Sequence, residues 1–309
     1  MPANRSATPK RIKDANLRYH DAAAAGYDSK WGIDFGPIGQ EQVRAKLTKA
    51  LGRWPESPFG EALEIGSGTG YFSLNLLQLG LIERLVATDI SPGMLGELAA
   101  TAKRLGLEVE TETTDAERLP FQNESFDLVF GHAVLHHLPD LPRALAELRR
   151  VLRPGGILAF CGEPSRYGDL LAAMPKRGAQ VAAPLWRLLL RAPARRADPA
   201  ERRDGHQLEP EVDVHAFAPG RLDRTLREAG FGRVRIRGEE LLANAYGWTV
   251  RTLEGTADPE RVPDRWRRFA FRSYLALQRV DASLLEPRLP ASAFYNLVLS
   301  ARKPETSRM

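Results

Sequence analysis

The sequence has almost no cysteine, since Cys161 is the only one among 309 residues. One cysteine cannot form an intramolecular disulfide and cannot by itself hold a structural zinc ion. The sequence also lacks a run of 18 consecutive apolar residues, and its first 30 residues contain basic side chains but no apolar segment. These absences exclude a disulfide-rich fold and predict neither a transmembrane segment nor a secretory signal. We therefore expect a cytoplasmic protein.

Strong compositional bias is absent as well, because hydrophobic residues make up 43% and charged residues 27%, as in ordinary globular proteins. The net charge of +5 hides two opposite segments. Residues 60–163 hold 8 basic and 15 acidic side chains, whereas residues 176–203 hold 8 and 2. The basic excess is thus confined to one stretch with a single aromatic residue, Trp186. A basic surface helix explains this better than a nucleic-acid interface does, so no nucleic-acid partner is expected.

Short apolar runs alternate with helical patterns in the first half of the chain. The runs predict strands at 63–65, 85–89, 107–111, 126–130 and 156–161, and the patterns predict helices at 71–79, 94–105 and 140–152. A helix at 219–229 and strands at 234–236 and 294–300 complete the series. Strands separated by helices pair in parallel through right-handed crossovers. We expect an α/β fold with a doubly wound, seven-stranded, mostly parallel sheet.

Two stretches without a strand pattern interrupt this series. The first contains six prolines, and only its leucine-rich segment 185–190 has a helical pattern. Both stretches follow the carboxyl ends of strands, the edge where open α/β sheets bind ligands, so we interpret them as substrate-covering insertions. The predicted divisions are an N-terminal helical cap (1–58), a core (59–163), a lid insertion (164–215), a core continuation (216–239), a second helical insertion (240–290) and a last core strand with its tail (291–309).

A glycine-rich turn, Gly66-Ser67-Gly68-Thr69-Gly70, lies between the first strand and the first core helix. Such a turn brings backbone amides and a helix N-terminus close to a ligand. A dinucleotide fingerprint would place glycine at position 71, where this sequence has tyrosine. Glu64 before the turn would repel a pyrophosphate but suits an ammonium group. The turn therefore favours a cationic ligand over a dinucleotide.

Further motifs accompany this turn, namely Asp89 at the end of the second strand, Asp115-Ala116 beyond the third, Phe126-Asp127-Leu128-Val129, Leu135-His136-His137-Leu138 and Leu152-Arg153-Pro154-Gly155-Gly156. With them the sequence resembles the class I S-adenosylmethionine-dependent methyltransferases. It is similar in particular to the small-molecule type 11 group that includes ubiquinone and menaquinone methyltransferases. The resemblance implies a Rossmann-like methyltransferase fold with S-adenosylmethionine as cofactor.

The resemblance also implies how the cofactor is held. Asp89 would accept hydrogen bonds from the ribose hydroxyls, and Asp115 with the Ala116 amide would bind adenine. Tyr27, in a segment similar to the cap helices of small-molecule methyltransferases, would reach the methionine end. The implied cofactor residues are Tyr27, Glu64, Gly66, Ser67, Gly68, Gly70, Asp89, Ile90, Met94, Asp115, Ala116 and His132. Ordinary turn, cap or packing roles for Asp89, Asp115 and Tyr27 remain open alternatives.

Histidines supply the candidate catalytic groups. His132 directly follows the fourth strand, from which this fold presents a side chain to the reacting methyl group, and His136 and His137 lie one turn further on. A neutral imidazole there could take a proton from a hydroxyl during methyl transfer. Of the latter two, His136 is the candidate, and packing is the alternative role for all three residues. His20, His206 and His215 lie outside the core without a carboxylate at ligand spacing, so no metal site is expected.

The expected function is methyl transfer to a small-molecule acceptor, lipophilic or ring-bearing, with oxygen favoured over carbon or nitrogen. One alternative is a nucleic-acid methyltransferase, but the segment Gly131-His132-Ala133-Val134 stands where base-amine enzymes carry Asn/Asp-Pro-Pro-aromatic. Another alternative is a non-catalytic S-adenosylmethionine-binding regulator, which the complete set of loop and acidic residues disfavours. The sequence leaves open the acceptor, the need for a base and the oligomeric state.

Overall fold

The computed structural model describes residues 8–195 and 214–305, so the predicted lid insertion and the basic stretch 176–203 lie partly outside the described residues. The chain forms two compact units. A sheet-bearing unit contains the described residues 8–163, 214–236 and 298–305, and a helical unit contains residues 164–195 and 237–297. In the described ranges no helix is both long and apolar enough to span a membrane.

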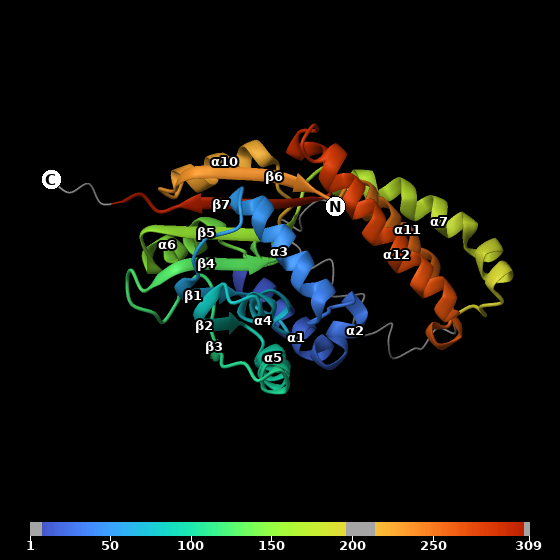
Figure 1. The fold of residues 1–309 in the computed structure, drawn as a ribbon, viewed down its shortest axis with the longest axis horizontal. Coiled ribbons are helices and arrows are strands. Elements are labelled where there is room, and N and C mark those ends of the chain that lie inside the picture. The colour runs from blue at the N-terminus through green and yellow to red at the C-terminus, as the bar shows by residue number, and fades with distance from the viewer. Residues whose placement is uncertain (1–7, 196–213, 306–309) are drawn as a thin grey trace. The chain divides into compact units, whose positions relative to one another are not determined.

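Seven strands form one sheet in the order β3-β2-β1-β4-β5-β7-β6 (Figure 1). β1 pairs in parallel with β2 and β4, and parallel pairs also join β2 to β3 and β4 to β5. The arrow of β7 points against that of β4 in Figure 1. The predicted fold class, a seven-stranded and mostly parallel doubly wound sheet, is therefore confirmed. The strands are β1 Phe59–Ile65, β2 Ile82–Asp89, β3 Glu110–Thr113, β4 Phe126–His132, β5 Leu152–Pro164, β6 Gly232–Glu239 and β7 Asn296–Arg302.

The direction of winding reverses between β1 and β4. Right-handed crossovers put the helices that follow β1 and β2 on one face and the helix that follows β4 on the other. A ligand site is expected at the carboxyl ends of these two neighbouring strands. The helices of this unit are α1 Pro9–Ala23, α2 Tyr27–Trp31, α3 Pro37–Leu51, α4 Tyr71–Gln78, α5 Pro92–Leu105, α6 Leu141–Val151 and α10 Pro219–Glu228.

Local sequence fixes where the core helices begin. The Ser91 hydroxyl accepts a hydrogen bond from the Met94 amide at 3.1 Å and caps α5, with Pro92 at its first turn. Asp140 caps α6 in the same way by accepting from the Arg143 amide. These caps position the loops that follow β2 and β4.

One predicted strand was displaced. The sequence placed the third strand at 107–111, whereas β3 spans Glu110–Thr113. The Leu107 amide donates to the carbonyl oxygen of Ala102, so residue 107 closes the end of α5. Leu107 and Val109 also pack beside the cluster that joins α4, β2 and α5. Their apolar character reflects this packing and not a strand.

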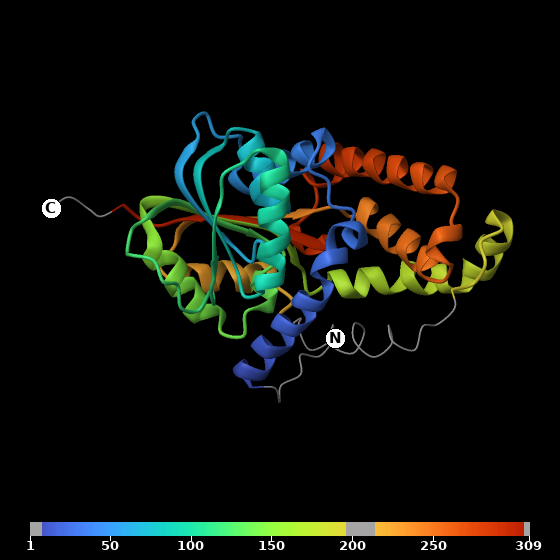
Figure 2. The same cartoon turned by 90° about the horizontal axis from the view of Figure 1, so that it is seen from below.

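The helical unit contains α7 Gly168–Leu190, α11 Leu242–Gly255 and α12 Asp264–Val280, which lie alongside one another in Figures 1 and 2. The helix that the sequence predicted at 185–190 is present, but it is the last part of a longer helix that begins at Gly168. α7 continues through both Pro175 and Pro184. Its small side chains Ala179 and Ala183 pack with Leu253 and other residues around α11, and this tertiary packing outweighs the lost backbone hydrogen bonds.

Candidate active site

A cavity of about 100 Å³ lies at the carboxyl ends of β1, β2 and β4, at the reversal point of the sheet. It brings together eight of the residues that the sequence analysis selected, from segments far apart in the chain. These eight are Tyr27, Gly66, Gly68, Asp89, Ile90, Asp115, Ala116 and His132. The other five selected residues do not line the cavity, and they are Glu64, Ser67, Gly70, Met94 and His136.

The glycine turn needs its glycines for different reasons. A Cβ on Gly66 would overlap the Val134 side chain, so a larger residue here would force that side chain or the turn to shift. Gly68 has φ +54°, and a Cβ there would have no protein atom within 4 Å. The space beside Gly68 is therefore open on the cavity side, where backbone can approach a ligand closely.

Asp89 links the turn to the end of β2. Its Oδ2 accepts a hydrogen bond from the Gly68 amide at 2.9 Å, and its Oδ1 accepts from the Ser91 amide at 2.9 Å. Burial raises the pKa of this carboxyl, and the amide hydrogen bonds oppose that shift. A carboxylate has about four lone-pair sites, so Asp89 retains acceptor capacity toward the cavity. Its turn-forming role and a ligand-binding role are compatible.

Replacing Asp89 with alanine is expected to weaken cofactor binding by about 1.5–3 kcal/mol, because hydrogen bonds to a charged acceptor are lost. Isothermal titration with S-adenosylmethionine measures the effect. Asp89→Asn should keep one acceptor oxygen for the turn and lose less affinity than alanine does. Wild-type affinity in the alanine variant would show that the ribose is bound elsewhere.

The N-terminal cap is attached to the cofactor-side loops by polar contacts. Lys13 on α1 forms an ion pair with Asp115 Oδ2 at 2.6 Å and a second with Glu117. Asp28 on α2 accepts a hydrogen bond from the Thr69 hydroxyl at 2.6 Å. Lys13, Asn16 and His20 of the cap also form part of the cavity wall. An amine that binds Asp115 must therefore share this carboxylate with Lys13.

Glu64 lies fully buried beneath the turn, and its Oε2 has no hydrogen-bond partner among the described residues. Burial raises the pKa of Glu64 from 4.5 to about 8. Because desolvation penalises the charged form, a nearby cation would stabilise the ionised carboxylate. Glu64 thus suits a cationic ligand, although it does not line the cavity itself.

The raised pKa of Glu64 predicts a pH-dependent stability. The folded state holds the proton more tightly than the unfolded state, so the stability from this group is fully present below pH 4.5 and is lost as the pH rises toward about 8. Glu64→Gln stays neutral and escapes this loss. We expect the melting temperature of the variant, relative to wild type, to rise between about pH 5 and 8. Thermal melts in which the difference in melting temperature between Glu64→Gln and wild type stays constant with pH would contradict this prediction.

His132 ends β4 and lines the cavity. Its ring stacks on Phe72 with centroids 5.2 Å apart and an interplanar angle of 18°, and it meets the edge of Tyr71 at 5.4 Å. A Cβ on Gly162 would lie 2.7 Å from His132 Nε2, so this glycine provides room for the imidazole. Ala133 has φ +54°, an uncommon conformation for alanine that accompanies many functional sites. The imidazole is thus held in a defined orientation.

His136 does not line the cavity and forms a buried pair with Glu163. Its Nδ1 lies 2.9 Å from Glu163 Oε2, and Glu163 is fully buried. The same carboxylate accepts hydrogen bonds from the amides of Val134, Leu135 and His136. Glu163 therefore fixes the loop after β4. The catalytic assignments of His132 and His136 stay predictions, and the geometry places only His132 at the cavity.

Sequence reasoning did not assign a site role to several residues at or near the cavity. Glu163 carried a signal, since it is an acidic residue at the carboxyl end of a buried central strand. His137 was considered together with His136 as a possible base, but nothing in the sequence showed which of the two reaches the cavity. Across the described residues, no group of three or more potential ligands could hold a metal ion. The unassigned residues are Lys13, Asn16, His20, Thr88, Thr114 and Glu163.

A family model and two sequence relatives are all similar to this chain, and all three are described as methyltransferases. Residues 63–160 match a family model described as a methyltransferase domain. A malonyl-[acyl-carrier protein] O-methyltransferase from Methylococcus capsulatus is 32% identical over 224 residues, which cover 71% of this chain and 66% of the relative. The enzyme of the same name from Serratia marcescens is 35% identical, covering 51% and 57%. The chain thus spans less than two thirds of either relative.

Among solved structures, a phosphoethanolamine N-methyltransferase from Haemonchus contortus in complex with S-adenosylmethionine has a TM-score of 0.58. It is 15% identical, and the match covers 96% of this chain and 60% of that one. At this identity the similarity concerns the fold.

The cavity fits the cofactor of these enzymes in chemistry. Gly68 offers open space beside its backbone, and Asp89 keeps acceptor capacity toward the cavity. Beneath the turn, Glu64 Oε2 is buried and has no hydrogen-bond partner within the part of the chain that the structure describes. The family model, the sequence relatives and the fold agree that the chain contains a methyltransferase domain similar to those of the class I S-adenosylmethionine-dependent methyltransferases.

Proposed function

We propose that this protein transfers the methyl group of S-adenosylmethionine to an oxygen atom of a small, lipophilic or ring-bearing acceptor. The observation that carries the proposal is the single cavity shared by Gly68, Asp89 and His132 at the reversal point of the sheet. Oxygen is favoured because two relatives are named as O-methyltransferases.

When bound, the cofactor supplies an electrophilic methyl group on a positively charged sulfur. The chain's own residues then bind and orient the reactants, which is the main requirement of an in-line displacement. Asp89 holds the ribose, the backbone beside Gly68 allows close approach, and the positive charge of the cofactor favours the ionised form of the buried Glu64. Tyr27, which is partly buried and lines the cavity, helps exclude water. His132 receives the proton when the acceptor is a hydroxyl.

A lipophilic acceptor is supported by the surface of the helical unit. α7 follows directly on β5 and exposes a stripe of large apolar side chains at helical spacing, including Met174 and Val181 at 80% and 84% exposure. Apolar stripes of this length are uncommon on soluble surfaces unless they meet a ligand, partner or membrane. The stripe consists of Leu170, Met174, Val181, Leu185 and Leu188.

A carboxylate on an acyl chain is one acceptor that is both lipophilic and methylated on oxygen. The malonyl group in the relatives' names has one free carboxylate when its other end is joined to a carrier. A carboxylate needs no proton removal before it attacks, whereas a hydroxyl of high pKa does. The two acceptor types therefore make different demands on His132.

Incubation with methyl-labelled S-adenosylmethionine and a panel of acceptors tests the proposal. The panel should contain long-chain carboxylic acids, malonyl thioesters, phenols and amines. It should also contain tRNA and duplex DNA, which test the alternative of a nucleic-acid methyltransferase. Label in an ester or ether is expected, and Asp89→Ala serves as the cofactor-binding control. Label on nitrogen, carbon or nucleic acid would overturn the proposed acceptor. Tight cofactor binding without transfer to any acceptor would favour a regulator.

A further inference from the structure

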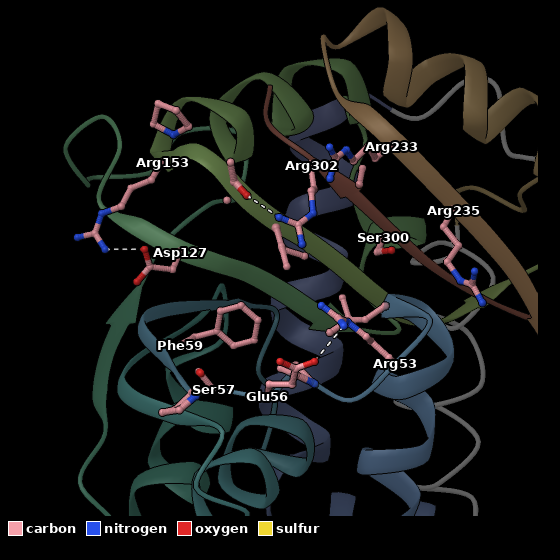
Figure 3. Close-up of a pocket in the computed structure, with 18 residues that line it drawn as sticks. Arg53, Glu56, Ser57, Phe59, Asp127, Arg153, Arg233, Arg235, Ser300 and Arg302 are labelled. Atoms are coloured by element: carbon pink, nitrogen blue, oxygen red, sulfur yellow. Dashed lines mark hydrogen bonds and ion pairs between the residues drawn. The ribbon is translucent and has the colours of Figure 1, made fainter. Parts of the chain in front are cut away.

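A second and larger cavity, about 600 Å³, lies at the opposite edge of the sheet from the cofactor cavity (Figure 3). It is lined by the segment before β1, the first residues of β5 and β6, and the last residues of β7. All of these belong to the sheet-bearing unit. Since β1 has 7 residues at ~3.3 Å each, the two cavities are separated by the length of a strand, roughly 20 Å.

The lining of this cavity is strongly basic. It contains five arginines but only two carboxylates, which leaves three positive charges. Asp127 pairs with Arg153 at 2.7 Å, and Glu56 pairs with Arg53 at 3.0 Å. Figure 3 shows that the arginines come from different segments around the cavity. They are Arg53, Arg153, Arg233, Arg235 and Arg302.

Two of the arginines are positioned by neutral backbone groups. Arg302 donates from Nη1 to the Gly155 carbonyl at 3.3 Å, and Arg235 donates from Nε to the Lys49 carbonyl at 3.2 Å. The Arg235 guanidinium also lies against Gly52, where a Cβ would come within 3.2 Å of it. A carbonyl orients a guanidinium without neutralising its charge. The carbonyl contact of Arg302 therefore orients its guanidinium beside the cavity, and Arg235 is oriented there as well.

Arg233 has an unusual backbone conformation that independently indicates a binding site. It has φ +49° although it is not glycine, and it stands at the second position of β6. Left-handed backbone is strained for such a residue and is found preferentially at binding sites. Its side chain is exposed and lines the cavity beside those of the β7 end.

We propose that this basic cavity binds a small molecule with two or more phosphate groups. Guanidinium groups match phosphate oxygens in a forked geometry, and arginines on separate segments can bind separate phosphates. The volume lies in the range of small-molecule sites, and a concave site of this size favours a small molecule over a nucleic-acid strand. Phe59 and Pro58 supply an apolar wall on which a base or other ring could pack.

Isothermal titration of the full chain with inorganic triphosphate and, separately, ATP tests the proposal. Both should bind, and the R233Q/R302Q double variant should lose at least about tenfold in affinity because two charge-assisted contacts are removed. Tighter binding of ATP would identify a nucleotide as the source of the phosphates, and equal binding a simple polyphosphate. The matched control is R224Q/R265Q, which removes the same charge from exposed residues outside the cavity.

Hydrogen exchange of the wild-type protein provides a readout that needs no variant. Triphosphate should protect amides in residues 51–59, 153–157 and 232–236, and S-adenosylmethionine affinity should remain within about twofold at saturating triphosphate. Absence of binding at millimolar triphosphate would overturn the proposal. So would equal losses in the two double variants, protection confined to the cofactor loops, or binding of duplex DNA alone.

Discussion

Replacing Gly68 with valine is expected to abolish S-adenosylmethionine binding, with a loss of at least about 100-fold, or about 2.7 kcal/mol. A Cβ at Gly68 meets no protein atom within 4 Å, so the valine side chain would point into the cavity. The folded protein has room for this side chain, but the side chain takes the space that the ligand needs. Titration with S-adenosylmethionine measures the loss.

Gly80 provides a matched control for this substitution. It has φ +64°, close to the +54° of Gly68, and a Cβ there also meets nothing within 4 Å. Gly80 does not line the cavity. Both valine variants should lose about 1–2 kcal/mol of stability from the left-handed backbone, but only Gly68→Val should lose binding. Cofactor bound normally in Gly68→Val, or lost equally in Gly80→Val, would refute this position of the site.

The core of the fold was predictable because its signal is local. Apolar runs such as 126–130 in β4 and the leucine spacing of α6 follow from burial on a sheet face or a helix face. Strand ends were less predictable. β1 begins at Phe59, four residues before the predicted start, because Phe59, Gly60 and Glu61 are only partly buried but still pair with β2.

α7 shows why local signals fail in the helical unit. Pro175 and Pro184 predict breaks, and a sequence window cannot weigh them against contacts made elsewhere. Ala179 and Ala183 are almost fully buried, and Trp186 packs against Trp266 of α12 with ring centroids 5.3 Å apart. These contacts join segments some 70 to 80 residues apart along the chain. The helix is thus determined by tertiary packing.

The site was predictable where family motifs stand at strand ends, as at Asp89 and His132. The contact between Lys13 and Asp115 was not, because it joins residues 102 positions apart. Nor could the sequence distinguish His136 from His137. The 3₁₀ turn at Leu135–His137 directs one ring toward buried Glu163, while the other reaches the cavity. Because the two histidines are neighbours in a turn, a small rotation of the backbone decides which of their rings reaches the cavity, and a sequence does not specify that rotation.

His132→Ala is expected to lower kcat by ~10²–10⁴-fold when the acceptor is a hydroxyl of high pKa, because a general base is lost. Cofactor affinity should stay within a few-fold. The wild-type rate should rise with pH through the neutral range, since only a neutral imidazole accepts the proton. Single-turnover assays over about pH 6 to 9 measure this. The melting temperature should change little, because the His132 side chain is partly exposed.

His136→Ala separates proton transfer from loop positioning. This ring is buried against Glu163, so its removal should lower the melting temperature and leave the pH profile of the remaining activity unchanged. If His132→Ala behaves in the same way, His132 acts as a wall of the cavity and not as a base. A wild-type rate that is flat from about pH 6 to 9, with near-normal turnover in His132→Ala, would point to an acceptor that is already ionised, such as a carboxylate. Catalysis would then rest on proximity and orientation alone.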